Sequence, residues 1–241
     1  MIPTPIGSIN ARRVAFTPPT LSGCILWLRG DMGITSTPTK ASAWADQSGA
    51  GNDWAQGTDA WRPAITSSNA NMGGVTTLAF TSSNIGLTRT NFAQGLSDIT
   101  IAITYRKAIA AGAPRVFGVI SASGGSFNCI CNSGVNAFDV GQINTGTNSV
   151  RTTPDDINTN YCRIATIPIS TAATVDPVVY TNGVAGGSIA SSTAVNGTIP
   201  AASWNIGYLF DGDVAEIVAY DRLLSAGEVS QLNAYMVDWI S

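Results

Sequence analysis

The feature that most constrains the fold is the strict alternation in the segment 98–107, DITIAITYRK. Ile99, Ile101, Ile103 and Tyr105 fall on one side of an extended chain, and smaller or polar residues fall on the other. A period of two is the geometry of a β-strand with one apolar face, whereas a helix would scatter these residues around its axis. The segment therefore predicts a strand that covers a hydrophobic core.

Similar short runs, separated by Gly, Asn, Ser and Pro, recur from residue 21 onward. The predicted strands are 24–29, 75–80, 98–107, 115–121, 127–131, 135–140, 160–168, 177–182, 203–209 and 212–221. TNG at 181–183 predicts a hairpin turn, because Asn and Gly accept positive φ angles at little cost. So many short strands predict an all-β protein, with two antiparallel sheets packed as a sandwich.

One segment, 225–240, has the pattern of a helix. Ser225 is a predicted N-cap, and Glu228 stands three residues later, which makes a capping box. Apolar residues then recur at helical spacing, namely Val229, Leu232, Met236 and Trp239. The sequence therefore predicts one C-terminal helix whose apolar stripe lies against the β body.

The first 20 residues, MIPTPIGSINARRVAFTPPT, carry four prolines and no periodicity. We expect residues 1–20 to form an extended arm and residues 21–241 to form the folded domain. The residues that would dock the arm onto a partner are Ile2, Pro3, Pro5, Ile6, Ile9, Val14 and Phe16. The alternative is a tail that packs against nothing, although such apolar anchors are not typical of a linker.

Charge and residue types narrow the classes of function. Charged residues make up 11% of the chain, and the formal net charge is −3, with no basic run beyond Arg12-Arg13. Phosphate neutralisation needs clustered cations, so the sequence disfavours nucleic-acid binding. The chain contains no histidine, which excludes Ser-His-Asp and Cys-His catalysis and histidine-ligated zinc.

The cysteines and the N-terminus indicate where such a protein is made. Four scattered cysteines without Cys-x-x-Cys spacing are typical of buried, reduced thiols: Cys24, Cys129, Cys131 and Cys162. MIPTPIGSIN has neither a basic n-region nor an apolar h-region, so we predict no signal peptide. No stretch is long and apolar enough to span a membrane. We therefore expect synthesis in a cytoplasm, without export by the usual signal route.

Several motifs resemble those of a known family. In chain order they are LWLRGD at 26–31, WADQSGAGND at 44–53, RPAI at 62–65, TLAF at 77–80, VYTNGV at 179–184 and FDGDVAEIVAYDRLLSAGEVSQLNAYM at 210–236. This series resembles the laminin-G-like, concanavalin A-like lectin jelly-roll domains that recur in bacteriophage structural proteins and bacterial surface proteins. The resemblance covers about 21–240 in outline, and it implies two curved antiparallel sheets with loops at the rim. Such domains usually bind glycans or other proteins, some carry calcium, and some relatives are glycosidases.

The loop WADQSGAGNDW at 44–54 has two interpretations. Asp46, Asn52 and Asp53, with backbone carbonyls, would supply the oxygen ligands that calcium prefers. Asn52 and Asp53 can instead cap backbone amides in a structural turn, which the absence of a nearby bidentate glutamate favours. We therefore predict a structural turn, with no cofactor required.

DGDVAE at 211–216 is the best candidate for a pair of catalytic carboxylates. Glycosidases of this family place acids as Glu-x-Asp-x-x-Glu on one strand, whereas this chain has Asp211, Asp213 and Glu216 without the leading glutamate. We therefore favour a structural role, with Glu216 held by an arginine such as Arg62 or Arg222.

Four aromatic residues are candidates for a platform on which sugar rings stack: Trp54, Trp61, Trp204 and Tyr208. The alternative is that these side chains are buried in the core, as tryptophans in a sandwich usually are.

Taken with the resemblance, these features predict a non-enzymatic bacteriophage virion structural protein that displays a lectin-like domain. It would be a capsid decoration or a head or tail fibre component, assembled in the host cytoplasm and located on the virion surface. Its predicted partners are the major capsid protein or a tail protein, reached through the arm, and host cell-surface glycans. We expect a homotrimer, because weak sites gain from multivalency. The alternatives are a carbohydrate-binding adhesin or receptor-binding module and, less favoured, a glycoside hydrolase.

Overall fold

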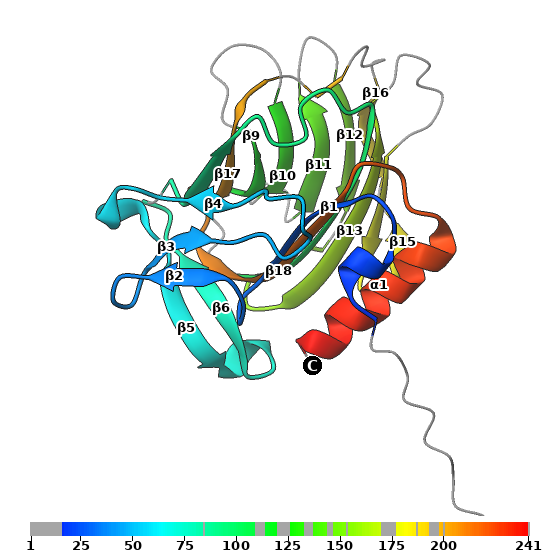
Figure 1. Ribbon diagram of the computed structural model, residues 1–241. Coiled ribbons are helices and arrows are strands. Elements are labelled where there is room, and N and C mark those ends of the chain that lie inside the picture. The colour runs from blue at the N-terminus through cyan, green and yellow to red at the C-terminus, as the bar shows by residue number, and fades with distance from the viewer. Residues whose placement is uncertain are drawn as a thin grey trace, which may run out of the picture.

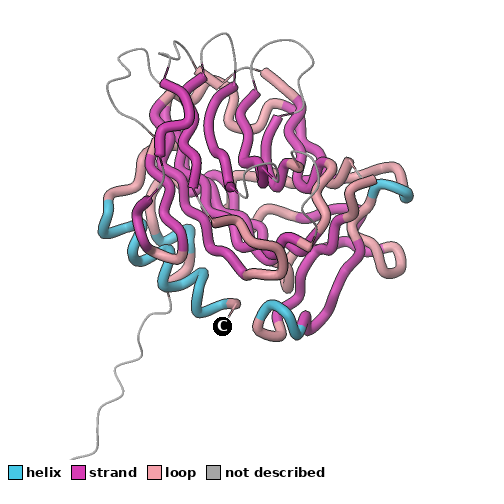
Figure 2. Tube along the Cα trace, turned by 180° about the vertical axis from the view of Figure 1, so that it is seen from behind, coloured by secondary structure: helices cyan, strands magenta, loops and turns pink. Residues whose placement is uncertain are grey.

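The computed structural model describes residues 16–83, 85–108, 114–119, 126–132, 137–143, 147–152, 154–169, 177–186, 188–192, 198–199 and 201–240. Strands make up most of this part of the chain, and they build two antiparallel sheets that face each other (Figure 1). A single α-helix near the C-terminus lies against the outside of one sheet, as the view from behind also shows (Figure 2). The predicted all-β sandwich with one C-terminal helix is confirmed.

The first sheet has eight strands among the described residues, in the order β15-β14-β13-β8-β18-β6-β5, with β1 also paired to β18. They are β1 (Cys24–Arg29), β5 (Ala64–Asn69), β6 (Val75–Phe80), β8 (Asp98–Lys107), β13 (Asn160–Pro168), β14 (Val178–Thr181), β15 (Val184–Gly186) and β18 (Gly212–Tyr220). One edge of β18 pairs first with β6 and then with β1, on either side of a bulge between Val214 and Glu216. Gly30 fits this junction because a Cβ there would lie 1.9 Å from the Thr76 carbonyl oxygen.

The second sheet has ten strands among the described residues, in the order β16-β12-β11-β10-β9-β17-β7-β4-β3-β2. They are β2 (Ile34–Ser36), β3 (Ala41–Trp44), β4 (Trp54–Ala55), β7 (Leu87–Thr90), β9 (Arg115–Val119), β10 (Ser126–Asn132), β11 (Ala137–Ile143), β12 (Thr147–Thr152), β16 (Ser188–Ser192) and β17 (Ser203–Tyr208).

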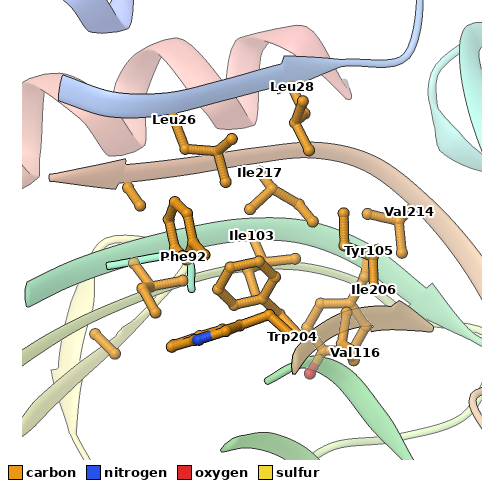
Figure 3. Close-up of a cluster of buried hydrophobic side chains, with 14 of the residues drawn as sticks. Leu26, Leu28, Phe92, Ile103, Tyr105, Val116, Trp204, Ile206, Val214 and Ile217 are labelled. Carbon is orange, nitrogen blue, oxygen red and sulfur yellow. The ribbon is translucent and has the colours of Figure 1, made fainter. Parts of the chain in front are cut away.

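The main hydrophobic core fills the space between the sheets (Figure 3). Ile103 and Tyr105 of β8 and Ile217 of β18 meet Trp204 and Ile206 of the second sheet there. The alternation in β8 places its isoleucines and Tyr105 in this core, as predicted. Both faces of β8 are nonetheless buried, because the helix covers the other one.

Helix α1 (Ala226–Trp239) forms a second core with the outer face of the first sheet. Its N-terminus carries the predicted capping box between Ser225 and Glu228. Val229, Leu232 and Met236 are buried against the sheet, which confirms the predicted stripe. Of the residues described, no helix has the length and apolarity needed to cross a membrane. Short 3-10 turns complete the elements: η1 (Pro18–Thr20), η2 (Asp59–Trp61) and η3 (Ala70–Met72).

Phe16 and Pro18 are part of the folded body, although both fall inside the predicted arm. The Phe16 ring packs edge-on against Tyr235 of α1, with 5.5 Å between the centroids. The Tyr220 hydroxyl donates to the Pro18 carbonyl at 3.0 Å. The remaining arm residues lie outside the described residues: Ile2, Pro3, Pro5, Ile6, Ile9 and Val14.

Cys24 and Cys162 are free thiols. Burial raises the pKa of both to about 12, so neither is a reactive thiolate. The side chains of Cys129 and Cys131 lie outside the description.

Candidate functional site

Trp61 is the most exposed of the predicted stacking residues, with 39% of its surface accessible. It ends η2, the short cyan turn on the side of the sandwich away from α1 (Figure 1). Arg62 follows it directly, and Asp59 of the same turn is exposed. An indole in such a place offers a flat apolar face with hydrogen-bonding groups around it.

The loop that carries Trp61 is held by side chains from the neighbouring segments. Gln56 Nε2 donates to the Gly86 carbonyl at 2.7 Å, and Gln56 Oε1 accepts from Thr58 N at 3.0 Å. Arg62 donates through Nε to the Gln56 carbonyl at 2.8 Å and through a terminal nitrogen to the Gly57 carbonyl at 2.9 Å. The loop is therefore fixed before any ligand arrives, which lowers the entropy cost of binding.

A surface ion-pair network borders the same loop. Lys40 Nζ donates to Asp59 Oδ2 and to the Asp59 carbonyl, both at 3.1 Å. Arg62 lies 3.4 Å from the other oxygen of the Asp59 carboxylate. These three side chains supply donors and acceptors next to Trp61.

The other three aromatic candidates do not join Trp61. Trp54 and Trp204 have no exposed surface, and both pack with Phe92 and Phe117 in the core between the sheets. Neither can present a face to a sugar, so the prediction is wrong for these two. Tyr208 is half-buried and lies under the Arg115 guanidinium, 5.3 Å from the ring centroid.

The loop 44–54 is closed by the Asp46 carboxylate. Its Oδ1 accepts from Trp27 N at 2.9 Å and from Ser48 N at 2.8 Å. Its Oδ2 accepts from Ser48 Oγ at 2.7 Å and from Asn52 N at 2.9 Å. Four donors occupy the carboxylate, so in this conformation it serves as the centre of a turn.

The other two residues of the proposed calcium set face different partners. Asp53 Oδ1 accepts from Asp46 N at 2.8 Å, so it caps a backbone amide seven positions back, across the loop. The Asn52 side chain bonds to the backbone through its Nδ2, which donates to the Ile25 carbonyl at 2.6 Å. Within the described residues, no group of three or more acidic, cysteine or histidine side chains is arranged to hold a metal.

Glu216 is fully buried beneath α1, at the bulge of β18. Its Oε1 accepts from Trp27 Nε1 of β1 at 2.6 Å and from the Tyr235 hydroxyl of α1 at 2.9 Å. Its Oε2 has no hydrogen-bond partner among the described residues. Burial raises the pKa of Glu216 to about 7, although the bonds from Trp27 and Tyr235 oppose this.

The predicted arginine partners of Glu216 are wrong. Arg222, three residues before the N-cap, forms its ion pair with Glu228 of the first turn of α1, at 2.6 Å. Arg62 belongs to the Trp61 loop. A different arginine, Arg29 of β1, lies near Glu216 and stacks over the Trp239 ring at 4.4 Å from its centroid.

The other two carboxylates of the predicted motif have different surroundings from Glu216. Asp213 Oδ1 accepts from Thr77 Oγ1 at 3.1 Å, on a different set of partners from Glu216. Asp211 is half-buried at the turn before β18.

A buried ionic cluster lies between the sheets. Lys107 Nζ and Asp155 Oδ2 are 2.7 Å apart, and Arg163 lies 3.7 Å from Asp155 Oδ1. All three side chains are inaccessible to solvent. One sequence signal could have found it: Lys107 continues the alternation that puts Ile103 and Tyr105 on the apolar face of β8.

No protein-family model matches the chain, and no curated protein matches it by sequence. Solved structures with a similar fold include domain 4 of AbnA, a GH43 extracellular arabinanase from Geobacillus stearothermophilus, in complex with arabinotriose. Its TM-score is 0.61 at 10% identity, over 87% of this chain and 98% of that one.

The binding domain of Paraclostridial Mosquitocidal Protein 1 has a TM-score of 0.62 at 13% identity, over 88% of this chain and 52% of that one. The Botulinum Neurotoxin serotype G binding domain has a TM-score of 0.59 at 17% identity, over 88% and 51%. This chain thus spans the whole arabinanase domain but about half of each toxin chain. Identities this low show a shared β-sandwich fold and no more.

Proposed function

We propose that this chain is a non-catalytic glycan-binding module and that Trp61 is the residue on which a sugar ring stacks. The observation that carries the proposal is the exposed indole on a loop that Gln56 and Arg62 hold in place. An exposed tryptophan is costly to keep in water, and a pinned loop keeps it in one position. Sugar C–H faces suit such a surface.

The polar side chains beside Trp61 would orient the sugar. Asp59 offers carboxylate oxygens, and Lys40 offers an ammonium group within reach of the same ligand. Small-ligand sites typically combine an apolar face with a few fixed polar groups in this way.

The burial of Glu216 supports a binding role over hydrolysis. A general acid must reach the glycosidic oxygen, whereas the Glu216 carboxyl is enclosed by Trp27 and Tyr235 and has no exposed surface. The nearest acid on the same strand, Asp213, is bonded to Thr77. A retaining or inverting glycosidase needs two carboxyls that share one cleft.

The fold comparisons support a sugar ligand. The arabinanase domain is described in complex with arabinotriose, and the two toxin domains are described as binding domains. We propose arabino-oligosaccharides as the first probe, with a broad glycan array beside them.

The test compares the wild type with Trp61→Ala, Trp61→Phe and Val184→Ala on the array and by isothermal titration calorimetry. Trp61→Ala should weaken binding by about tenfold or more, the affinity equivalent of about 1.4 kcal/mol, whereas Trp61→Phe should keep most of it. Val184 is 71% exposed on β15, so Val184→Ala removes an exposed apolar group elsewhere and should bind normally. Wild-type protein that binds no glycan, or Trp61→Ala that binds as well as wild type, would contradict the proposal.

The kind of surface that carries the module is a second part of the proposal. The virion surface protein predicted from the sequence and a cellular adhesin both suit a glycan-binding domain. The virion hypothesis requires the arm, residues 1–20, to attach the domain to a capsid or tail protein. Deletion of residues 1–15, which keeps the Phe16 contact with Tyr235, should leave the fold intact and abolish incorporation into particles. Normal incorporation of the truncated chain would contradict the arm hypothesis.

A further inference from the structure

Lys107 and Asp155 lie within hydrogen-bonding distance of each other in the interior, and neither residue belongs to the proposed glycan site. Nζ is 2.7 Å from Oδ2, and the two side chains are 1% and 0% exposed. Nζ also donates to the backbone carbonyl of Asp155, which holds the amine against this one residue. We propose that Lys107 and Asp155 condense in the folded protein to an intramolecular amide bond.

The two oxygens of the Asp155 carboxyl have different surroundings. Oδ1 accepts from the Tyr105 hydroxyl at 2.5 Å and lies 3.7 Å from a terminal nitrogen of Arg163. Oδ2 faces Lys107 Nζ. The hydrogen bond from Tyr105 and the nearby positive charge of Arg163 stabilise the negative charge that develops on Oδ1 when an amine attacks the carbonyl carbon, as in an oxyanion hole. Oδ2 is then the oxygen that leaves.

The reaction balances without any other reagent. One proton passes from the Lys107 ammonium to Oδ2, which gives a neutral amine and a carboxylic acid. The nitrogen lone pair attacks Cγ, a second proton moves from nitrogen to Oδ2, and the bond from Cγ to Oδ2 breaks. The products are one amide and one water molecule. Nζ is hydrogen-bonded to Oδ2, and Oδ2 is covalently bonded to Cγ. The attacking nitrogen therefore lies close to the carbon that it attacks.

Aromatic rings enclose the pair and keep water away. Tyr105 stacks on Phe138 at 5.6 Å and lies 5.9 Å from Tyr161, and all three rings are buried. Exclusion of water favours condensation over hydrolysis and strengthens the donors at Oδ1. The surroundings also suit the product, because the amide N–H can keep the Asp155 carbonyl as acceptor while Oδ1 keeps Tyr105.

Arg163 keeps three hydrogen bonds to uncharged groups through its two terminal nitrogens when the carboxylate charge is lost, whereas its Nε has no partner among the described residues. It donates to the Pro154 carbonyl at 2.6 Å and to Thr152 Oγ1 at 3.0 Å. It also donates to Thr181 Oγ1. Its guanidinium lies 4.2 Å from the Tyr161 ring centroid, and an aromatic face stabilises a cation that has been removed from water.

The bond would join the two sheets covalently. Lys107 ends β8 of the first sheet, and Asp155 follows β12 of the second. The two residues are 48 positions apart, and β9, β10, β11 and β12 lie between them. A cross-link that closes a long loop restricts the unfolded chain and resists unfolding by heat or protease.

Intact-mass spectrometry of the denatured full-length protein tests the proposal. The expected mass is lower than the sequence mass by one water, about 18 Da. Trypsin should then release KAIAAGAPR joined to TTPDDINTNYCR, the peptides 107–115 and 152–163, as one branched species. Full sequence mass after prolonged incubation of the folded protein would overturn the proposal.

Two variants and the fragment spectrum exclude other sources of water loss. Lys107→Arg keeps the positive charge but cannot condense, so its mass should equal its sequence mass. Tyr105→Phe removes the donor to Oδ1 and should raise the unlinked fraction. A water loss confined to the linear peptide 152–163 would indicate a cyclised aspartate and would overturn the proposal, and the wild-type spectrum decides even if a variant fails to fold.

Discussion

Glu216 gives this protein a pH-dependent stability that can be measured almost in isolation. Burial raises the pKa of its carboxyl from the ordinary 4.5 to about 7. The chain has no histidine, so no imidazole titrates in the same range. Arg29, Asp31, Trp27 and Tyr235 surround the group, and the donors among them only partly offset the cost of burial.

The sign and size of the effect follow from proton linkage. The folded pKa lies above the unfolded one, so the folded state binds this proton more tightly. The stabilisation is fully present below about pH 4.5 and is lost as the pH rises through about 7. The folded and unfolded pKa values of Glu216 differ by about 2.5, and each pKa unit corresponds to about 1.4 kcal/mol. The free energy of unfolding should therefore fall by about 3 kcal/mol as the pH rises.

Urea unfolding followed by tryptophan fluorescence, at several pH values from about 4.5 to 8, measures this fall. Glu216→Gln keeps an oxygen that can accept from Trp27 and Tyr235 but cannot ionise, so its stability should be flat over the same range. A flat wild-type profile, or an equal slope in Glu216→Gln, would refute the reasoning.

Further predictions concern the charged groups and one glycine. Asp155→Ala should lower the free energy of unfolding by about 3–5 kcal/mol relative to the chain in which the amide has not formed, because it leaves the buried Lys107 and Arg163 without their carboxylate. Asp59→Ala is the control, because it also removes an aspartate that lies between a lysine and an arginine, but an exposed one; it should lower the free energy of unfolding by about 1 kcal/mol or less. Equal losses for Asp155→Ala and Asp59→Ala in urea unfolding would show that burial does not decide the cost. Gly30→Ala should destabilise by about 1–3 kcal/mol in the same assay, since its Cβ would strike the Thr76 carbonyl oxygen; an unchanged midpoint would contradict this. Hydrogen bonds from Arg222 and Ser225 lower the pKa of Glu228 to about 2, so its contribution is present above about pH 4.5 and disappears as the pH falls towards 2; Glu228→Gln should remove that part of the acid unfolding profile.

The long elements were predictable because each carries its own pattern. The segments 24–29, 75–80, 98–107 and 160–168 are strands with the predicted bounds, and the helix differs from the prediction by one residue at each end. Asn182 and Gly183 have positive φ angles of 47° and 85°, as the predicted hairpin requires. Local sequence suffices where alternation, caps and turn residues all lie within a few positions of one another.

Short strands escaped prediction because a period of two needs several residues to be visible. β2, β4 and β15 have three residues or fewer, and they are held by their neighbours in the sheet rather than by their own sequence. The predicted strands therefore omit β2 and β4, and they also omit β5, whose six residues AITSSN show no regular alternation of apolar and polar side chains.

The candidate stacking residues also differ in how far the sequence could predict their exposure. Trp61 stands in a turn with charged neighbours and is exposed, whereas Trp54 and Trp204 stand in strands and point into the core. Alternation shows that a strand has two faces, but it does not say which face the partner sheet covers.

The sequence by itself determined the strand-rich class, the capped helix and the absence of histidine chemistry, because these depend on residue type and local spacing. Only the tertiary structure decided which side chains meet. Glu216 bonds to Trp27, 189 positions away, and Asp155 meets Lys107, 48 positions away. The order in which the strands pair brings these groups together, including Lys107 and Asp155. Burial away from water then raises the pKa of Glu216.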